Sequence, residues 1–155
     1  MKTSVQAAFR HCHQLALAHY ENFPVASRLI SAKKRKYVWA IYAFARTADD
    51  LADKEESLAR LAEWDEKLDT AVSGEPTEPI FIALKQTIEE CQIPPSLLHD
   101  LVTAFRRDVQ QNRHETFDAL LDYCHYSANP IGRLVLLIHG YRDDQLFYWS
   151  DKICT

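Results

Sequence analysis

Apolar residues recur along most of this chain at the three- to four-residue spacing of helices that bury one face. Capping residues, prolines and glycines separate these segments, and no stretch shows the strict alternation of a half-buried strand. The sequence therefore predicts an all-α protein. The expected helices cover residues 5–20, 34–54, 57–72, 77–91, 94–112 and 116–140, the last interrupted near Asn129 and Pro130, and a further helical pattern begins at Asp144.

The segment 34–54 contains the most apolar run of the chain, residues 37–45. A helix that is apolar on all sides is normally buried, so we expect this one to lie in the core. Asp49 and Asp53 follow the run, and residues four positions apart share one helical face. Two close carboxylates in a buried place are costly without a cation or a proton. The pair therefore indicates a divalent metal that in turn holds an anionic ligand.

The spacing of the two aspartates is not by itself specific. Asp65/Asp69 and Asp118/Asp122 repeat it. The first of these pairs stands among other charged residues, which favours a solvated helix edge, and Asp118 falls in a first helical turn, where a carboxylate favours the helix dipole. For Asp49 and Asp53 the competing interpretation is that the helix emerges into water at this point.

The roles of three other polar residues are not decided by residue type and spacing. Arg46 precedes Asp49 by three positions, so it either neutralises the acids or holds phosphate oxygens with its guanidinium fork. Tyr123 and Asn129 flank the proline-interrupted segment. A tyrosine on a helix is usually a core residue with a satisfied hydroxyl, and residue type alone assigns neither side chain a role in binding.

Composition narrows the class of protein. A chain of 155 residues with 47% hydrophobic and 26% charged residues fits one globular domain. Its net charge of −4 argues against a nucleic-acid partner. The nine-residue apolar run is shorter than the roughly 20 residues of a membrane-spanning helix, and residues 1–6 lack the apolar core of a signal peptide. We expect a cytoplasmic protein.

Three segments together resemble the squalene/phytoene synthase family. They read NFPVASRL at 22–29, YAFARTADDLAD at 42–53 and YCHYSANPIG at 123–132. The aspartate block is specific to the family, and the resemblance spans nearly the whole chain. The Asn129-Pro130 variant is similar to the HpnC branch, the hydroxysqualene synthases of squalene and hopanoid biosynthesis, and departs from the form found in most relatives.

The resemblance implies an all-α isoprenoid synthase bundle around a deep apolar cavity. It also implies roles for individual residues. Asp49, Asp50 and Asp53 would hold Mg²⁺ that binds the substrate diphosphate, Arg46 would contact that diphosphate, His19 and Ser27 would line its entrance, Tyr123 would face the reacting carbocation, and Asn129 would contact the substrate.

We expect residues 1–155 to be the N-terminal portion of a single isoprenoid synthase domain. The helical pattern from Asp144 stops at Thr155 without a cap, and the family's second aspartate-rich helix follows a segment like 150–155. The C-terminal helices of the bundle, with half of the metal cage, would then be missing. On that expectation this portion alone would be inactive or severely impaired.

The expected reaction of the intact protein is the Mg²⁺-dependent ionisation of presqualene diphosphate to hydroxysqualene. Within the family, the alternative is head-to-head condensation of farnesyl or geranylgeranyl diphosphate to presqualene diphosphate, squalene or phytoene. An alternative of another class is a helical module without catalysis, which would dimerise through its open face or bind a lipid tail. Peripheral contact with the inner membrane face stays open, because the prenyl substrates partition into lipid.

Overall fold

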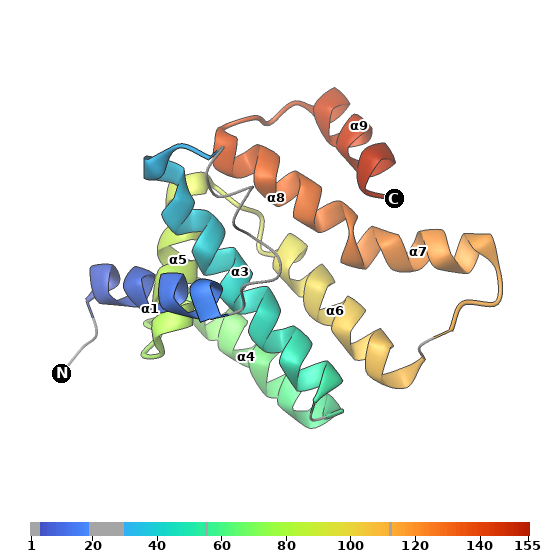
Figure 1. The fold of residues 1–155 in the computed structure, drawn as a ribbon, viewed down its shortest axis with the longest axis horizontal. Coiled ribbons are helices and arrows are strands. Elements are labelled where there is room, and N and C mark those ends of the chain that lie inside the picture. Colours follow the sequence, from blue (N-terminus) through green and yellow to red (C-terminus); the bar gives the residue numbers. More distant parts are fainter. Residues whose placement is uncertain (1–3, 19–29, 55, 112) are drawn as a thin grey trace.

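The described part of the chain is built from helices and contains no strand (Figure 1). The structure, a computed structural model, describes residues 4–18, 30–54, 56–111 and 113–155. The helices are α1 (Val5–Ala18), α3 (Ala32–Asp53), α4 (Leu58–Ser73), α5 (Pro79–Cys91), α6 (Ser96–Gln110), α7 (Phe117–Ser127), α8 (Asn129–His139) and α9 (Asp144–Cys154). The all-α prediction is confirmed, and the predicted helices are found within a few residues of their expected ends.

Local side-chain chemistry explains several of these ends. The Ser57 hydroxyl accepts a hydrogen bond from the Arg60 backbone N–H at 3.3 Å, and Thr116 caps α7 in the same way. Gly140 ends α8 with a φ of +88°, a conformation that suits glycine. The predicted interruption of the long segment is confirmed, because α7 ends at Ser127 and α8 starts with Pro130 near its N-terminus.

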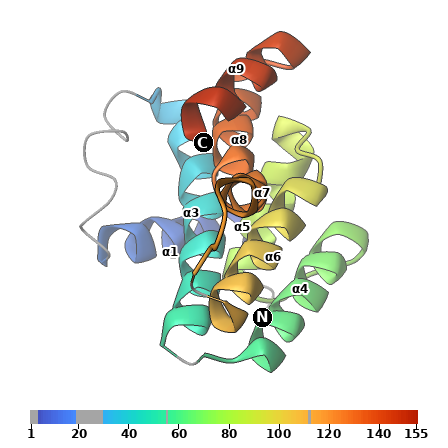
Figure 2. The same ribbon diagram turned by 90° about the vertical axis from the view of Figure 1, so that its right-hand side faces the viewer.

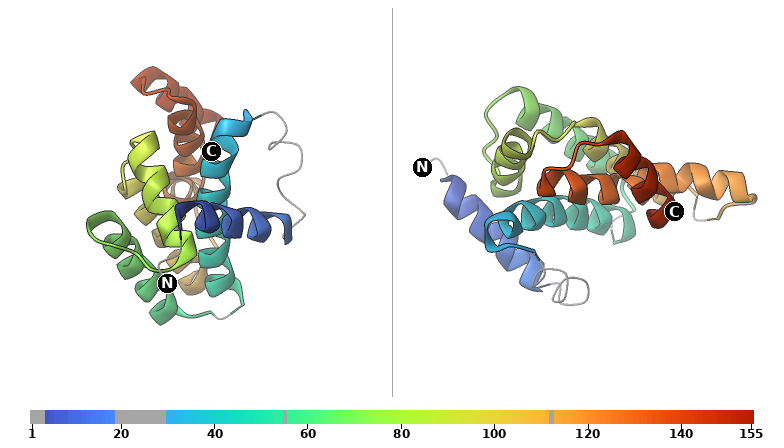
Figure 3. Two further views of the ribbon diagram at one scale, coloured as in Figure 1. Left: turned by 90° about the vertical axis from the view of Figure 1, so that its left-hand side faces the viewer. Right: turned by 90° about the horizontal axis from the view of Figure 1, so that it is seen from above.

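Helix α3 is the centre of the packing, in contact with α1, α4, α5, α6 and α8. Helix α1 packs against α3 and α5, and the left-hand view in Figure 3 shows it running across them. Phe44 of α3 is fully buried and lies 5.7 Å from the Trp64 ring and 6.1 Å from the Phe81 ring, between centroids. Burying these aromatic rings contributes a large share of the hydrophobic stabilisation. The predicted burial of the apolar run in α3 is confirmed.

Helices α7, α8 and α9 lie over one side of this core. Helix α8 contacts both α3 and α6, α7 contacts α6, and α9 packs on α8 (Figure 2). No residue of α7 or α9 is buried. Large apolar side chains are exposed there: Phe117, Leu120, Leu121, Ile131, Val135, Leu146, Tyr148, Trp149 and Ile153. This set defines an open apolar face of the last three helices.

Candidate functional site

The predicted acidic pair lies at the end of α3. Asp49 is half-buried, with 32% of its side chain exposed, while Asp53 is exposed. Burial raises the pKa of the Asp49 carboxyl, the nearby Asp53 carboxylate raises it further, and the Arg46 guanidinium partly opposes both. Burial thus disfavours the charged form of Asp49 although Arg46 lies beside it.

Arg46 lies beside these acids on the same helix. Its Nη1 is 2.8 Å from Asp49 Oδ2, and its Nη2 is 2.6 Å from Asp50 Oδ1. Asp50 has a second cation, the Lys54 ammonium at 3.1 Å. Within the described residues the buried Nε of Arg46 has no hydrogen-bond partner. Arg46 pairs with two of the acids, as the neutralising interpretation predicts. Its contact with a diphosphate stays a prediction.

A third carboxylate faces this region from α6. Burial raises the pKa of Asp108, and the nearby Asp53 carboxylate adds to the shift. Tyr123 of α7 is near enough to influence the pKa of Asp108, which it lowers in part. The sequence analysis did not single out Asp108, because no aspartate pair, apolar run or family motif includes it. Its position becomes informative only when α6 packs against α3.

Tyr123 is half-buried between two side chains. The His114 ring lies 4.8 Å from the Tyr123 ring, between centroids, and the Asp108 carboxylate lies on the neighbouring helix α6. Burial and the Asp108 carboxylate raise the pKa of Tyr123 to about 12. The phenol is therefore neutral across the physiological range. Tyr123 is thus near Asp108, and Asp108 is in turn near Asp53 of α3.

An apolar groove lies between α3 and α8. Its volume is about 100 Å³. It is lined by Val38, Ile41, Tyr42 and Ala45 of α3 and by Ile131, Leu134, Val135 and Ile138 of α8. Ala45 and Tyr42 stand one and two turns before Asp49, so they lie close to the same helical face. An apolar groove on the same helical face as a half-buried carboxylate suits a ligand with an apolar chain and a metal-bound anionic head.

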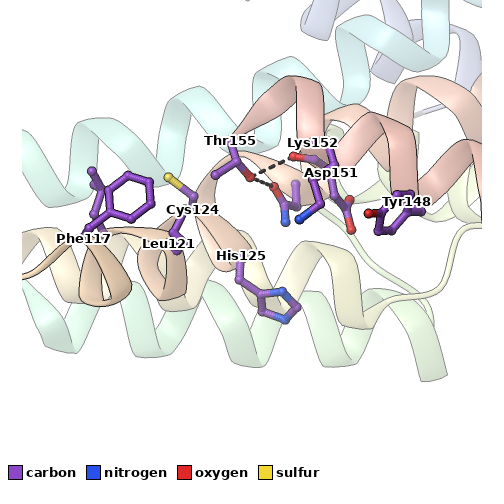
Figure 4. Close-up of a pocket in the computed structure, with 10 residues that line it drawn as sticks. Phe117, Leu121, Cys124, His125, Tyr148, Asp151, Lys152 and Thr155 are labelled. Carbon is purple, nitrogen blue, oxygen red and sulfur yellow. Dashed lines mark hydrogen bonds between the residues drawn. The ribbon is translucent and has the colours of Figure 1, made fainter.

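A larger hollow of about 530 Å³ opens between α7 and α9 (Figure 4). Asn129 lines this hollow, and its Oδ1 accepts a hydrogen bond from the Thr155 hydroxyl at 2.9 Å. Tyr123 and Asp49 do not line it. The structure thus separates Asn129 from the acidic residues, and its contact with substrate stays a prediction. His19 and Ser27, the other two predicted contacts, lie outside the described residues.

The donor chemistry at the end of α3 fits a hard divalent cation. Carboxylate oxygens are the ligands that Mg²⁺ takes up, and a cation would offset the burial and the repulsion from Asp53 that raise the pKa of Asp49 and Asp108. In the described ranges no three His, Cys, Asp or Glu side chains converge closely enough to enclose an ion. The roles of Asp49, Asp50 and Asp53 as metal ligands stay a prediction.

The second aspartate pair has a different environment from the one predicted. Asp65 is half-buried, its Oδ1 lies 2.7 Å from His99 Nδ1, and its Oδ2 lies 3.2 Å from Arg106 Nη2. The other His99 nitrogen is 3.3 Å from Asp69. The prediction of a solvated edge is wrong for Asp65, because α6 supplies partners that are distant in sequence. Asp118, in contrast, is exposed in the first turn of α7 as predicted.

None of the helices described in the structure is long and apolar enough to cross a bilayer.

Comparisons with known proteins point to one family. The sequence model of squalene/phytoene synthase matches residues 16–155. The chain is 44% identical over 143 residues to the hydroxysqualene synthase of Zymomonas mobilis, a match that covers 87% of this chain and 46% of that protein. It is 29% identical over 143 residues to the phytoene synthase of Arthrospira platensis, covering 90% of this chain and 46% of that protein. The chain thus spans about half the length of the curated relatives it matches.

Solved structures agree with this result. The fold matches the crystal structure of squalene synthase HpnC from Alicyclobacillus acidocaldarius with a TM-score of 0.92 and 40% sequence identity. That match covers 97% of this chain and 58% of the other. The isoprenoid synthase fold expected from the sequence is confirmed for the part of the bundle that this chain contains.

Proposed function

The chain belongs to the squalene/phytoene synthase family, and from this premise we propose that the intact protein ionises a prenyl diphosphate. We propose presqualene diphosphate as the substrate and hydroxysqualene as the product. The names of its relatives support this choice, since hydroxysqualene synthases match this chain at 40–44% identity and phytoene synthases below 30%. In the reaction the carbon–oxygen bond to the diphosphate breaks, the diphosphate leaves with the electron pair, and water captures the cation and loses a proton.

The acidic end of α3 would receive the diphosphate. Mg²⁺ bound by Asp49, Asp50 and Asp53 would supply the positive charge that stabilises the leaving group. Arg46, already directed at Asp49 and Asp50, would turn part of its guanidinium to the phosphate oxygens. Asp49 would then have its charge compensated by bound ligand rather than by Arg46 alone.

The apolar groove between α3 and α8, with a volume of about 100 Å³, would contact a short part of the hydrocarbon chain. Tyr42 and Ala45 on α3 and Leu134 on α8 line it, so water has few polar partners there. Exclusion of water would protect the carbocation until capture. Tyr123 would face that cation with its neutral phenol. The single observation that carries the proposal is that α3 lines an apolar groove and bears the half-buried Asp49 within two turns of it.

Product analysis tests the proposal. The intact protein is incubated with Mg²⁺ and, separately, with presqualene, farnesyl or geranylgeranyl diphosphate, and the lipids are identified by mass spectrometry. We expect hydroxysqualene from presqualene diphosphate. Presqualene diphosphate, squalene or phytoene formed from the shorter diphosphates would support the condensing alternative instead. Turnover of none of the three would favour the helical module without catalysis.

The exposed apolar side chains of the last three helices lead to a proposal that does not depend on the reaction. We propose that the open apolar face of α7, α8 and α9 is covered in the intact protein, because so many exposed apolar side chains are uncommon on an isolated domain. A homodimer through that face and peripheral contact with a membrane stay predictions.

A further inference from the structure

We propose that His99 joins α4 to α6 as a proton-dependent brace: the doubly protonated imidazole pairs with Asp65 and Asp69 together, and loss of one ring proton releases Asp69. Both acids lie on α4, and His99 lies on α6, which packs against α4 (Figure 2). This inference does not depend on the proposed function, because it concerns the packing of two helices and its response to pH.

Both nitrogens of the His99 ring face a carboxylate. The ring Nδ1 lies 2.7 Å from Asp65 Oδ1, and Nε2 lies 3.3 Å from Asp69 Oδ1. A neutral imidazole carries one N–H, so its other nitrogen would present a lone pair to a carboxylate oxygen that has no proton to donate. The imidazolium carries an N–H on each nitrogen and attracts both acids. The geometry therefore fits the charged ring.

The two acids differ in the partners they keep when the ring is neutral. Asp65 is half-buried, with 23% of its side chain exposed, and its Oδ2 lies 3.2 Å from Arg106 Nη2. It keeps this cation across the neutral range, because a guanidinium does not lose its proton there. Asp69 has 72% of its side chain exposed, and among the described residues His99 provides its only ion pair. The Asp69 contact is therefore the part of the brace that a proton controls.

The surroundings of the ring add no other charged partner among the described residues. Helix α6 also packs against α3, α7 and α8, and none of these helices pairs a charged side chain with His99 within the described ranges. Asp100, the next residue of α6, acts instead on Arg133 of α8. Carboxylates and guanidinium groups keep their charge between about pH 5.5 and about pH 8.5, whereas an imidazole changes its charge in this range. The protonation of His99 thus sets the strength of the brace.

The residue type at this junction makes the packing sensitive to pH. A lysine or an arginine would pair with Asp65 and Asp69 over the whole neutral range, but a histidine pairs with both only when it is protonated. The brace is therefore present in mild acid, and it weakens as pH rises and the ring becomes neutral. The helix it holds, α4, is the one that follows the acidic end of α3 along the chain.

Urea unfolding of the intact protein at about pH 5.5 and about pH 8.5 tests the brace. Asp69→Asn removes the controlled carboxylate with little change of shape. Glu66→Gln is the matched control, because Glu66 is also exposed on α4 and also loses one negative charge. We expect the unfolding equilibrium constant of Asp69→Asn, divided by that of the unsubstituted protein, to be about threefold larger at the lower pH. For Glu66→Gln this ratio should be nearly the same at both pH values. A ratio for Asp69→Asn that does not change with pH overturns the proposal.

The ring proton is observed directly by NMR of the intact protein with ¹⁵N-labelled histidine. We expect the His99 ring to give up its second proton at a lower pH in Asp69→Asn than in the unsubstituted protein, because the facing carboxylate stabilises the charged ring. Glu66→Gln should shift that pH by less. Loss of the proton at the same pH in Asp69→Asn and in the unsubstituted protein contradicts the proposal.

Substitution of the histidine separates the brace from the other titrating groups. His99→Gln keeps a polar side chain that cannot gain a proton, so Asp69→Asn in this background should have the same effect on unfolding at both pH values. An effect that still depends on pH in the double variant assigns the dependence to another group and contradicts the proposal. Should His99→Gln fail to fold by circular dichroism, the NMR comparison decides, because Asp69 is exposed and its substitution leaves the core intact.

Discussion

Two aspartate pairs with identical spacing meet different partners in this molecule. Asp65 and Asp69 on α4 are joined by His99, and Arg106 lies 3.2 Å from the first of them. Within the described residues, Asp49 and Asp53 on α3 form no ion pair with a cation from another helix. The cation at Asp49 is Arg46 of the same helix, shared with Asp50.

Helix α6 creates this difference. It directs His99 and Arg106 at α4, where they compensate acids, and it brings Asp108 near the α3 pair, where it adds another negative charge. Equal spacing in sequence therefore has opposite electrostatic results. Uncompensated charge that raises a pKa is the property expected of a binding site, whereas a compensated cluster stabilises the packing of two helices.

The largest expected effect is on turnover. Asp49→Asn and Asp53→Asn should each lower the rate of hydroxysqualene formation by at least about 100-fold, because they remove charge that holds the leaving diphosphate through its cation. Asp65→Asn and Asp69→Asn, with the same change at the same spacing, should keep the rate within about threefold in folded protein. The rates are measured with the intact protein and presqualene diphosphate. Equal losses in the two pairs would erase the proposed difference between them.

A second expected effect is on stability, and it runs in the opposite direction. Asp65→Ala should lower the free energy of unfolding by about 1–3 kcal/mol, because Arg106 and His99 lose a half-buried charged partner. Asp49→Ala should be close to neutral or stabilising, since the fold disfavours the charged form of that carboxyl. Urea unfolding followed by circular dichroism measures both. A larger loss in Asp49→Ala would contradict this assignment.

The smallest expected effect is a pH dependence. The folded-state pKa of Asp49 is raised, so its ionised form destabilises the fold, and this penalty disappears as pH falls through the raised pKa. At pH 7 Asp49→Asn should therefore be slightly more stable than the unsubstituted protein, by under about 1 kcal/mol. The difference should vanish below the ordinary pKa of 3.8. Urea unfolding at a series of pH values measures it, and a difference that grows on acidification would show the opposite sign of shift.

Much of the fold could be predicted from the sequence, because its signals are local. Ser57 and Thr116 cap helices by reaching three residues ahead, and Gly140 ends α8 through its own backbone conformation. The burial of the apolar run around Phe44 follows from periodicity. These features need no knowledge of how the helices are arranged.

The site was only partly predictable, because its electrostatics are tertiary. Asp49 was found from the apolar run that precedes it, and Tyr123 from the family resemblance. Asp108 was missed and Asp65 was misjudged for one reason: the partners of both depend on where α6 packs, and His99 follows Asp65 by 34 residues. The charged neighbours of Asp65 in the sequence predict a solvated side chain, but the packing of α6 brings His99 and Arg106 against it.

The central claim is that the acids at the end of α3 bind a diphosphate through a divalent cation. Titration calorimetry of the intact protein with pyrophosphate, with and without Mg²⁺, tests it most directly. We predict binding that requires Mg²⁺, that Asp49→Ala removes and that Asp65→Ala retains. Binding that is independent of Mg²⁺, or that survives in folded Asp49→Ala, would contradict the claim.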